Sequence, residues 1–249
     1  MKRLENKVAL VTGSSKGIGA GIAKQFAHEG ANVVVNYSSS NRAAEKVVNE
    51  ITQNGGTAIA VQADISKHAD IERLFGETKK AFDGLDVLVN NAGVWEMESL
   101  GEISEESFHK QVNTHLKGSI FCTQHAAAMF DNNGGSIINI SSTMSINPLP
   151  GTMIYSAAKA GIDNVTKVLA KELGSQEIRI NTLAPGQTRT EGNQETGITG
   201  SEIEQQMVDK TPLGRVGQPG DIAKVATFLA SDEAGWVTGE RISASGGLL

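Results

Sequence analysis

The fold is decided by residues 8–23, which read VALVTGSSKGIGAGIA. An apolar run of strand length leads directly into glycines at positions 13, 17 and 19, and a helical pattern of small and apolar residues follows. Glycines at such a junction allow a tight turn and let backbone N–H groups approach an anion at the positive end of the helix dipole. The stretch therefore predicts a phosphate-binding loop, and a plain glycine-rich turn is the alternative.

Short β-rich runs alternate with helical patterns along the whole chain. The runs are continuously apolar, which is typical of parallel strands covered by helices on both faces. Strands and helices that alternate and are joined by right-handed crossovers build an open, doubly wound α/β sheet. We therefore predict one α/β domain over residues 1–249, with about seven parallel strands and no linker or repeat. The expected strands are 8–12, 32–36, 58–62, 87–90, 136–140, 179–183 and 241–244, and the expected helices lie near 18–29, 41–54, 67–82, 104–130, 152–173 and 220–230.

One long irregular stretch interrupts this alternation between about Pro185 and Pro219. It contains several glycines and one short segment, 201–209, for which a helix is expected. A loop of that length in a compact domain is usually functional. We predict a substrate lid at about residues 186–218, and a disordered excursion is the alternative.

Composition and charge exclude several classes of function. The net charge is −6, and no basic run is longer than the pair Lys79–Lys80, which argues against nucleic-acid binding. No apolar run approaches the ~20 residues that a membrane span needs, and no apolar signal core precedes the first strand. The single cysteine, Cys122, is expected to be a packed thiol in a reducing compartment, and the five histidines form no metal-type cluster. We therefore expect a cytoplasmic protein without a catalytic metal, which binds neither nucleic acid nor membrane.

A phenol and an ammonium lie four residues apart at Tyr155 and Lys159, on one face of the expected helix. An exposed tyrosine titrates near ~10, and a neighbouring ammonium lowers that pKa. The strand 136–140 ends in Ser141 and Ser142, at the edge where open α/β sheets place their sites. A serine hydroxyl there can hold a substrate oxygen as charge develops on it. The three side chains indicate acid–base chemistry, whereas Tyr155 and Lys159 taken alone could be a surface pair.

With the glycine loop at residues 13–19 followed by Ser142, Tyr155 and Lys159 in this order and at these spacings, the chain resembles the short-chain dehydrogenase/reductase family in its single-domain form. The resemblance covers nearly the whole sequence and implies a Rossmann-like fold. It also implies hydride transfer between a nicotinamide dinucleotide and a carbonyl or alcohol substrate, as in carbonyl reductases, 3-oxoacyl-carrier-protein reductases and glucose dehydrogenases. The matching residues are Thr12-Gly13-x-x-x-Gly17-x-Gly19, Asp64, Asn90-Asn91-Ala92-Gly93, Asn113, Ser142, Tyr155-x-x-x-Lys159 and Pro185-Gly186.

The resemblance implies a role for each matching position. Tyr155 would be the general acid in carbonyl reduction and the general base in alcohol oxidation. Lys159 would bind the nicotinamide ribose and lower the pKa of Tyr155, Ser142 would orient the substrate oxygen, and Asn113 would hold a water that links Lys159 to solvent. The cofactor would lie against Gly13, Ser15, Lys16, Gly17, Ile18, Gly19, Asn36, Tyr37, Ser38, Asp64, Ile65, Asn90, Ala92, Gly93, Tyr155, Lys159, Pro185, Gly186, Thr188 and Thr190.

Three of these positions also have a purely structural interpretation. Asp64 could cap a helix, Asn90 could satisfy backbone groups between strands, and Asn113 could bend its helix. These structural roles are compatible with the functional ones.

The end of the second expected strand bears on the choice of dinucleotide. NAD-specific proteins of this architecture place an acidic residue there to accept both ribose hydroxyls, whereas this strand ends in the uncharged Asn36. Lys16, Ser38 and Arg42 are expected to reach a 2′-phosphate. We therefore predict a preference for NADP(H), with some use of NAD(H), because Tyr37 stands where many NADP-dependent relatives have arginine.

The expected substrate pocket is mostly apolar and favours a hydrophobic ketone or ketoester. A 3-oxoacyl-carrier-protein reductase and a glucose 1-dehydrogenase are the alternatives within the family, although residues 129–135 offer an acidic carrier no Lys or Arg. A non-catalytic dinucleotide-binding regulator is the alternative from another class. The resemblance also implies a homotetramer in which the helices 104–130 and 152–173 pair between subunits. The expected pocket residues are Trp95, Ser142, Met144, Leu149, Met153 and Tyr155.

Overall fold

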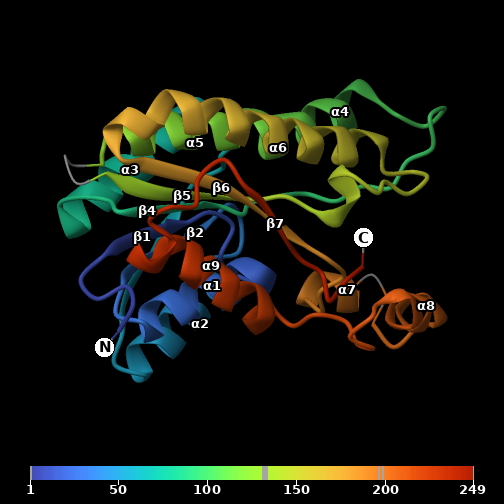
Figure 1. Cartoon of the computed structure of the whole chain (residues 1–249), viewed down its shortest axis with the longest axis horizontal. Coiled ribbons are helices and arrows are strands. Elements are labelled where there is room, and N and C mark those ends of the chain that lie inside the picture. The colour runs from blue at the N-terminus through green and yellow to red at the C-terminus, as the bar shows by residue number, and fades with distance from the viewer. Residues whose placement is uncertain (1, 131–133, 196, 198, 249) are drawn as a thin grey trace.

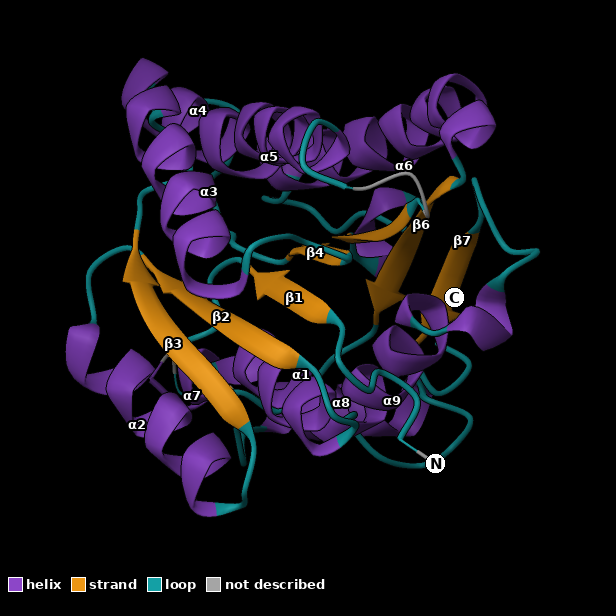
Figure 2. Cartoon of the chain, turned by 90° about the vertical axis from the view of Figure 1, so that its left-hand side faces the viewer, coloured by secondary structure: helices purple, strands orange, loops and turns teal. Residues whose placement is uncertain are grey.

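The computed structural model describes residues 2–130, 134–195, 197 and 199–248. Within them, parallel strands form one seven-stranded sheet in the order β3-β2-β1-β4-β5-β6-β7 (Figures 1 and 2). The predicted doubly wound α/β fold is therefore confirmed. The strands are β1 (Val8–Val11), β2 (Asn32–Tyr37), β3 (Thr57–Gln62), β4 (Val87–Asn90), β5 (Gly135–Ile140), β6 (Ile178–Pro185) and β7 (Arg241–Ala244).

Helices cover both faces of the sheet, as Figure 1 shows. The helices on one face pack against the sheet through Ile22 and Phe26, and those on the other face pack through Leu74 and Cys122. All four side chains are fully buried. Burial raises the pKa of the Cys122 thiol to about 12, which agrees with the predicted packed cysteine. The first layer consists of α1 (Gly17–His28), α2 (Asn41–Gln53) and α9 (Pro219–Ala230), and the second consists of α3 (His68–Phe82), α4 (Glu105–Val112), α5 (Gly118–Ala127) and α6 (Met153–Leu173).

The strand order reverses at β1, which pairs with β2 on one side and with β4 on the other. In open α/β sheets, ligands bind beyond the carboxyl ends of the strands at such a switch point. The glycine loop after β1 and the segment after β4 therefore lie side by side at the place where the sequence predicts a dinucleotide.

Two helical predictions need correction. The expected helix 104–130 is divided, because a π-helical turn (Asn113–Lys117) separates α4 from α5. The expected lid contains two helices where one was predicted, α7 (Glu191–Glu195) and α8 (Glu202–Lys210). A helix as short as α7 carries too little periodicity to be read from sequence. In the described part of the chain, no helix is both long and apolar enough to cross a membrane.

Candidate active site

The glycine loop packs directly on the segment that follows β4. A Cβ atom on Gly13 would lie 2.7 Å from the Cα of Ala92, and one on Gly19 would lie 2.4 Å from the Nδ2 of Asn91. Asn91 also donates hydrogen bonds to the backbone oxygens of Thr12 and Gly13, at 2.9 and 3.0 Å. The glycines are therefore required by close packing as well as by the turn. Asn91, which the sequence did not single out as a site residue, ties the two segments together.

The glycine loop already holds an anionic group at the N-terminus of α1. The backbone N–H of Gly17, whose φ is +60°, donates a 2.9 Å hydrogen bond to a carboxylate oxygen of Glu191 in α7. The methyl group of Thr190 would lie 3.3 Å from a Cβ on Gly17. The loop thus accepts negative charge where a pyrophosphate would lie, and the segment between β6 and α9 reaches across it.

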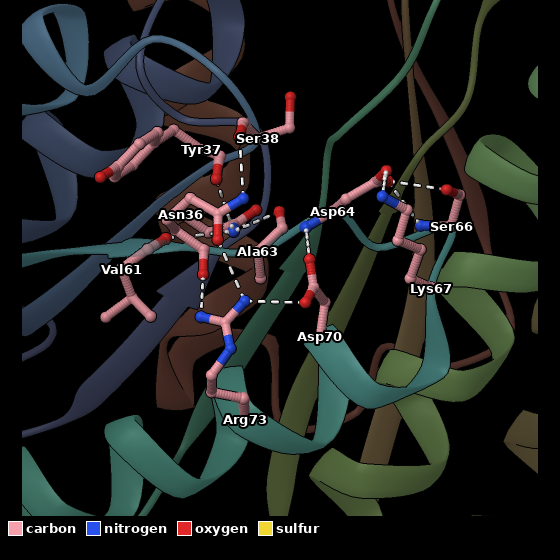
Figure 3. Close-up of polar contacts among 11 residues, drawn as sticks. Asn36, Tyr37, Ser38, Val61, Ala63, Asp64, Ser66, Lys67, Asp70 and Arg73 are labelled. Atoms are coloured by element: carbon pink, nitrogen blue, oxygen red, sulfur yellow. Dashed lines mark hydrogen bonds and ion pairs between the residues drawn. The ribbon is translucent and has the colours of Figure 1, made fainter.

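Asn36 is not exposed to a ligand, contrary to the prediction. Its side chain is 1% exposed because β2 continues one residue further, to Tyr37. The carboxamide oxygen accepts from Gly13 N–H at 3.0 Å, and the NH₂ group donates to the backbone oxygens of Val61 and Ala63 (Figure 3). Asn36 therefore fastens the glycine loop to the ends of β2 and β3, and its donors and acceptor are used inside the protein.

Tyr37 and Ser38 come directly after Asn36 and are more exposed than it is. The Tyr37 phenol donates a 2.7 Å hydrogen bond to Asn41 at the start of α2. The Ser38 carbonyl accepts from the Gln62 side chain at 2.9 Å, and Arg73 binds both oxygens of Gln62 (Figure 3). Through Gln62, Arg73 of α3 therefore holds the segment that follows β2 in place.

Asp64 holds the loop after β3 and does not cap α3, whose N-cap residue is Lys67. Its carboxylate accepts from the backbone N–H and hydroxyl of Ser66, at 3.0 and 2.7 Å, and its own N–H donates to Asp70. That N–H and the Arg73 guanidinium lower the pKa of Asp70. The loop after β3 is therefore held by charge-assisted bonds, with Asp64 and Ile65 at the carboxyl edge of the sheet.

Asn90 has a structural role of the same kind. Its NH₂ group donates to Asn139 of β5 at 2.9 Å and to Thr123 of α5 at 3.1 Å. The side chain is 3% exposed, so it joins β4 to β5 and to the helix above them.

Ser142, Tyr155 and Lys159 come together at the carboxyl end of β5. Ser142 follows β5, while the other two face inward from the first turns of α6. The Ser142 hydroxyl is close enough to Tyr155 to lower the pKa of the phenol, and the Lys159 ammonium lies 5.7 Å from the centre of the tyrosine ring. Trp95 packs on the same ring with a centroid distance of 4.8 Å.

Burial shifts the pKa values of Tyr155 and Lys159 in opposite directions. It raises the pKa of Tyr155 above its usual value of 10.0, against the opposing effect of the Ser142 hydroxyl. Burial lowers the pKa of Lys159 to about 8, although the Asp163 carboxylate favours the charged form. Lys159 donates a 2.6 Å hydrogen bond to the Ile140 carbonyl. The phenol is consequently protonated at neutral pH, as a proton donor must be.

Arg241 of β7 supports Ser142 from a distant part of the sequence. Its guanidinium donates to the Ser142 carbonyl at 3.0 Å and to the Asp163 carboxylate at 2.9 Å. Ser145 donates to the same carboxylate. Sequence reasoning missed Arg241 and Asp163, because 99 positions separate Arg241 from Ser142 and neither residue belongs to a motif.

Asn113 and His115 both lie in the π-helical turn that follows α4. The His115 ring lies 5.2 Å from the Tyr155 ring, while Asn113 makes no direct hydrogen bond to Tyr155 or Lys159 among the described residues, and a water held by Asn113 stays a prediction. The sequence carried a signal for the contact of His115. Ser107, Gln111 and His115 recur every four residues, and all are buried on one face. Asn113 lies off that face and begins the π-helical turn.

The segment after β6 reaches the glycine loop through Thr190 rather than through Thr188. Thr188 is 4% exposed, and its hydroxyl donates to the Gly186 carbonyl at 3.0 Å. Gly186 packs so closely on the residue after β7 that a Cβ would lie 2.8 Å from the Cα of Ser245. The sequence placed both threonines at the cofactor, and only Thr190 lies over the loop.

An apolar groove lies between the segment after Ser142 and the outer face of α6. It has a volume of about 440 Å³ and runs between the Ser142–Gly151 segment and the start of α6. Three of the expected pocket residues line it, namely Met144, Leu149 and Met153, together with Pro148 and Pro150. Ser142 and Tyr155 are not part of its lining, and Met144 links the two regions, since its N–H donates to the Ser142 hydroxyl at 3.1 Å.

Comparison with known proteins identifies the family. The family model described as enoyl-(acyl carrier protein) reductase matches residues 13–249. An uncharacterized oxidoreductase of Methylorubrum extorquens is 50% identical over 100% of both chains, and the 3-oxoacyl-[acyl-carrier-protein] reductase of Staphylococcus aureus is 41% identical over 97% of this chain and 98% of its own. A short-chain dehydrogenase/reductase from Serratia marcescens superposes with a TM-score of 0.93 at 33% identity over 99% of both chains. The angucycline C-6 ketoreductase LanV, solved with bound NADP, reaches the same TM-score at 36% identity over 99% of this chain and 97% of its own. The chain belongs to the short-chain dehydrogenase/reductase family and is an NAD(P)-dependent oxidoreductase acting on CH–OH and C=O groups.

Proposed function

We propose that the chain reduces a hydrophobic ketone or ketoester with NADPH, and that Tyr155 is the proton donor. The observation that carries this proposal is the convergence of Ser142, Tyr155 and Lys159 beside the glycine loop. The cradle formed by Gly13 and Gly19 and the anion-binding N–H of Gly17 fit a dinucleotide pyrophosphate.

The bound dinucleotide supplies the hydride, and the chain's own residues manage the substrate oxygen and the proton. The Ser142 hydroxyl holds the carbonyl oxygen as negative charge develops on it. The Tyr155 phenol, which burial keeps protonated, donates its proton to that oxygen. The Lys159 ammonium stabilises the phenolate that remains, and it is itself held by the Ile140 carbonyl.

The apolar segment between Ser142 and α6, which lines the groove, is the chain's own support for a substrate with apolar substituents. The walls of the groove are mainly proline, leucine and methionine side chains, and Leu149 and Met153 are about half exposed along it. Such a surface gains free energy by covering hydrocarbon, at about 25 cal/mol per Å² of apolar area, and offers a sugar few hydrogen-bond partners. This arrangement favours a ketone or ketoester over glucose.

Reduction of a 3-oxoacyl group on a carrier protein is the second candidate, because a relative with that activity in its name is 41% identical. A carrier protein is acidic and needs positive charge around the mouth of the site. The segment that follows Trp95 instead carries Glu96, Glu98, Glu102, Glu105 and Glu106. This negative charge repels an acidic carrier protein, and it therefore favours a free ketone or ketoester.

Preference for NADP(H) is proposed on two grounds. A related ketoreductase was solved with bound NADP, and in this chain the residues on the exposed side after β2, Tyr37 and Ser38, carry no negative charge. An acidic residue there would bind the free ribose hydroxyls of NAD(H) and repel a 2′-phosphate.

Tyr37→Asp is expected to lower the ratio of kcat/KM for NADPH to that for NADH by roughly tenfold or more, about 1.4 kcal/mol of differential binding. Steady-state kinetics with both dinucleotides measures the ratio. Asn36→Asp is the comparison variant, since it places a carboxylate against the Val61 and Ala63 carbonyl oxygens. It should cost roughly 2–4 kcal/mol of folding free energy without a matching switch of cofactor. A switch in Asn36→Asp alone would contradict this assignment.

Glu191 is expected to compete with the cofactor phosphates for the N–H of Gly17. Glu191→Gln should lower the Kd of NADPH roughly 3- to 10-fold at low salt, because an exposed charge near an anion costs about 1 kcal/mol. Glu202→Gln, an exposed carboxylate in α8, is the matched control. Fluorescence titration of NADPH gives both constants, and equal Kd values for the two variants would refute the competition.

A homotetramer is proposed from the outer face of the helical layer. Phe108 of α4, Ile120 of α5 and Val168 of α6 are 45%, 38% and 47% exposed. Apolar side chains of this size on adjoining helices mark an association surface. Sedimentation at micromolar concentration is expected to show four chains, and a species of one chain only would exclude the assembly.

The proposed function is tested by NADPH oxidation against a panel of aryl ketones, β-ketoesters, a 3-oxoacyl carrier protein and, in reverse, glucose with NADP⁺. The expected result is the highest kcat/KM with a free hydrophobic ketone or ketoester. The highest value with the carrier-bound substrate or with glucose would replace this proposal by the corresponding alternative.

A further inference from the structure

Arg241 and Asp163 form a buried ion pair between strand β7 at the edge of the sheet and helix α6. The Nε of Arg241 lies 2.9 Å from the Oδ2 of Asp163, and the two side chains are only 16% and 10% exposed. The other carboxylate oxygen, Oδ1, is buried and has no hydrogen-bond partner among the described residues. A buried ion pair with one oxygen left unpaired contributes little net stability. A role in stability therefore accounts poorly for this pair.

The guanidinium of Arg241 also holds the backbone of Ser142. Its Nη2 donates a 3.0 Å hydrogen bond to the Ser142 carbonyl, which accepts a second bond from the Ser145 N–H at 3.1 Å. A carbonyl oxygen has two lone pairs, so both are used. The Ser145 hydroxyl donates to the Asp163 carboxylate at 2.5 Å. The two ends of the short turn Thr143–Ser145 are therefore fixed, one by β7 and the other by α6.

This turn determines how the Ser142 hydroxyl can act. Ser142 is the N-cap residue of the turn, and its Oγ accepts a hydrogen bond from the Met144 N–H at 3.1 Å. A hydroxyl has one proton and two lone pairs, and this bond uses a lone pair, so the proton can be donated to a substrate oxygen. Met144 is also one of the side chains that line the apolar groove. The turn therefore sets both the direction of the hydroxyl and the position of an apolar side chain next to it.

We propose that Arg241 is a positioning residue of the active site, which holds the turn after β5 so that the Ser142 hydroxyl directs its proton at the substrate oxygen. The inference rests on the proposed function, in which Ser142 binds the carbonyl oxygen of the substrate. In this role Arg241 contacts neither substrate nor cofactor. It acts through the Ser142 carbonyl, while Asp163 holds the guanidinium in place. A guanidinium suits the position, because its rigid fork of donors can bind a carboxylate and a carbonyl at once.

The test measures whether the effect of Arg241 depends on Ser142. Arg241→Leu is expected to lower kcat roughly 10- to 30-fold, while the Kd of NADPH changes less than about threefold. In a Ser142→Ala background, where no hydroxyl is left to orient, the same change should lower kcat less than about threefold. Ser243→Ala is the matched control, since it removes the 2.8 Å bond of the same guanidinium to a residue of β7 itself, and it should keep kcat within about twofold. An equal loss in both backgrounds, or wild-type kcat in Arg241→Leu, would overturn the proposal.

A double variant separates positioning from charge neutralisation. Arg241→Leu leaves the Asp163 carboxylate buried without its cation, which is expected to lower the urea midpoint of unfolding. Arg241→Leu/Asp163→Asn removes that charge and should recover most of the lost midpoint, but not kcat, because the Ser142 carbonyl still lacks its donor. Recovery of wild-type kcat in the double variant would show that Arg241 only neutralises Asp163. If Arg241→Leu does not fold, the double variant takes its place in both backgrounds.

A readout independent of turnover distinguishes this proposal from the proposed function. NMR of the chain labelled with ¹³C-methyl methionine reports on Met144, whose signal is assigned with Met144→Leu. The signal is expected to move in Arg241→Leu, because the turn is released from β7, and to stay in place in Ser243→Ala. An unchanged Met144 signal in Arg241→Leu would overturn the role of Arg241 whatever the substrate is. Failure of the wild type to reduce any ketone would instead contradict the proposed function.

Discussion

Tyr155→Phe is expected to lower kcat for ketone reduction by at least ~10²–10⁴-fold, the usual loss when a general acid is removed. Phenylalanine keeps the ring contacts with Trp95 and His115, at 4.8 and 5.2 Å, and removes only the hydroxyl group. The Kd of NADPH should therefore stay within a few-fold of the wild-type value. Stopped-flow reduction of the best ketone and fluorescence titration of NADPH measure the two quantities. Comparable turnover in the variant, with any good substrate, would remove Tyr155 from the mechanism.

Lys159→Met is expected to lower kcat/KM by roughly 10²-fold or more, because the cation that stabilises the phenolate is lost. The same change should leave the fold as stable as the wild type, or stabilise it by about 1–3 kcal/mol at pH 7. Methionine occupies similar space, and burying an ammonium is costly even when a carbonyl accepts one of its protons. Activity and unfolding free energy, measured on the same preparation, check both expectations.

The difference in unfolding free energy between Lys159→Met and the wild type should decrease as the pH rises. The pKa of Lys159 is about 8 in the folded chain and is lowered by burial from 10.5. Between these values the unfolded chain binds more protons, so the stability of the wild type rises with pH. The advantage of Lys159→Met should therefore be largest below pH 8 and vanish as the pH approaches 10.5. Urea unfolding at pH 7, 9 and 10.5 tests this, and a constant difference across the series would show that Lys159 is not the group responsible.

The sheet could be predicted from the sequence because its signals are local. Each buried parallel strand is a short apolar run, and the strand-to-helix junction after β1 shows its glycines directly. The group formed by Ser142, Tyr155 and Lys159 was also predictable, since its members follow from the end of one strand and the start of the next helix. These features depend on residues that are close together in the sequence, so the sequence alone was sufficient to predict them.

The errors arose where tertiary packing decides the outcome. Asn36 was expected at the cofactor, but one more residue of pairing in β2 buries its carboxamide among Gly13, Val61 and Ala63. His115 belongs to no motif, and it reaches Tyr155 because the buried face of α4 continues to it.

The contribution of β7 could not be predicted at all. Arg241 reaches Ser142 and Asp163 only because β7 pairs with β6 at the edge of the sheet. No motif surrounds these residues, and no local pattern indicates that they meet.

The most direct test of the account follows the hydride and the proton in one experiment. The wild-type chain and Tyr155→Phe are each incubated with NADPH that carries deuterium at both C4 positions of the nicotinamide and with a hydrophobic β-ketoester, and the product is analysed by mass spectrometry and NMR. The account predicts that the wild type forms one alcohol for each NADPH oxidised, with deuterium on the carbinol carbon, and that Tyr155→Phe forms almost none while still binding NADPH. Binding of NADPH by the wild type without oxidation by any carbonyl compound, or deuterium-free alcohol, would contradict it.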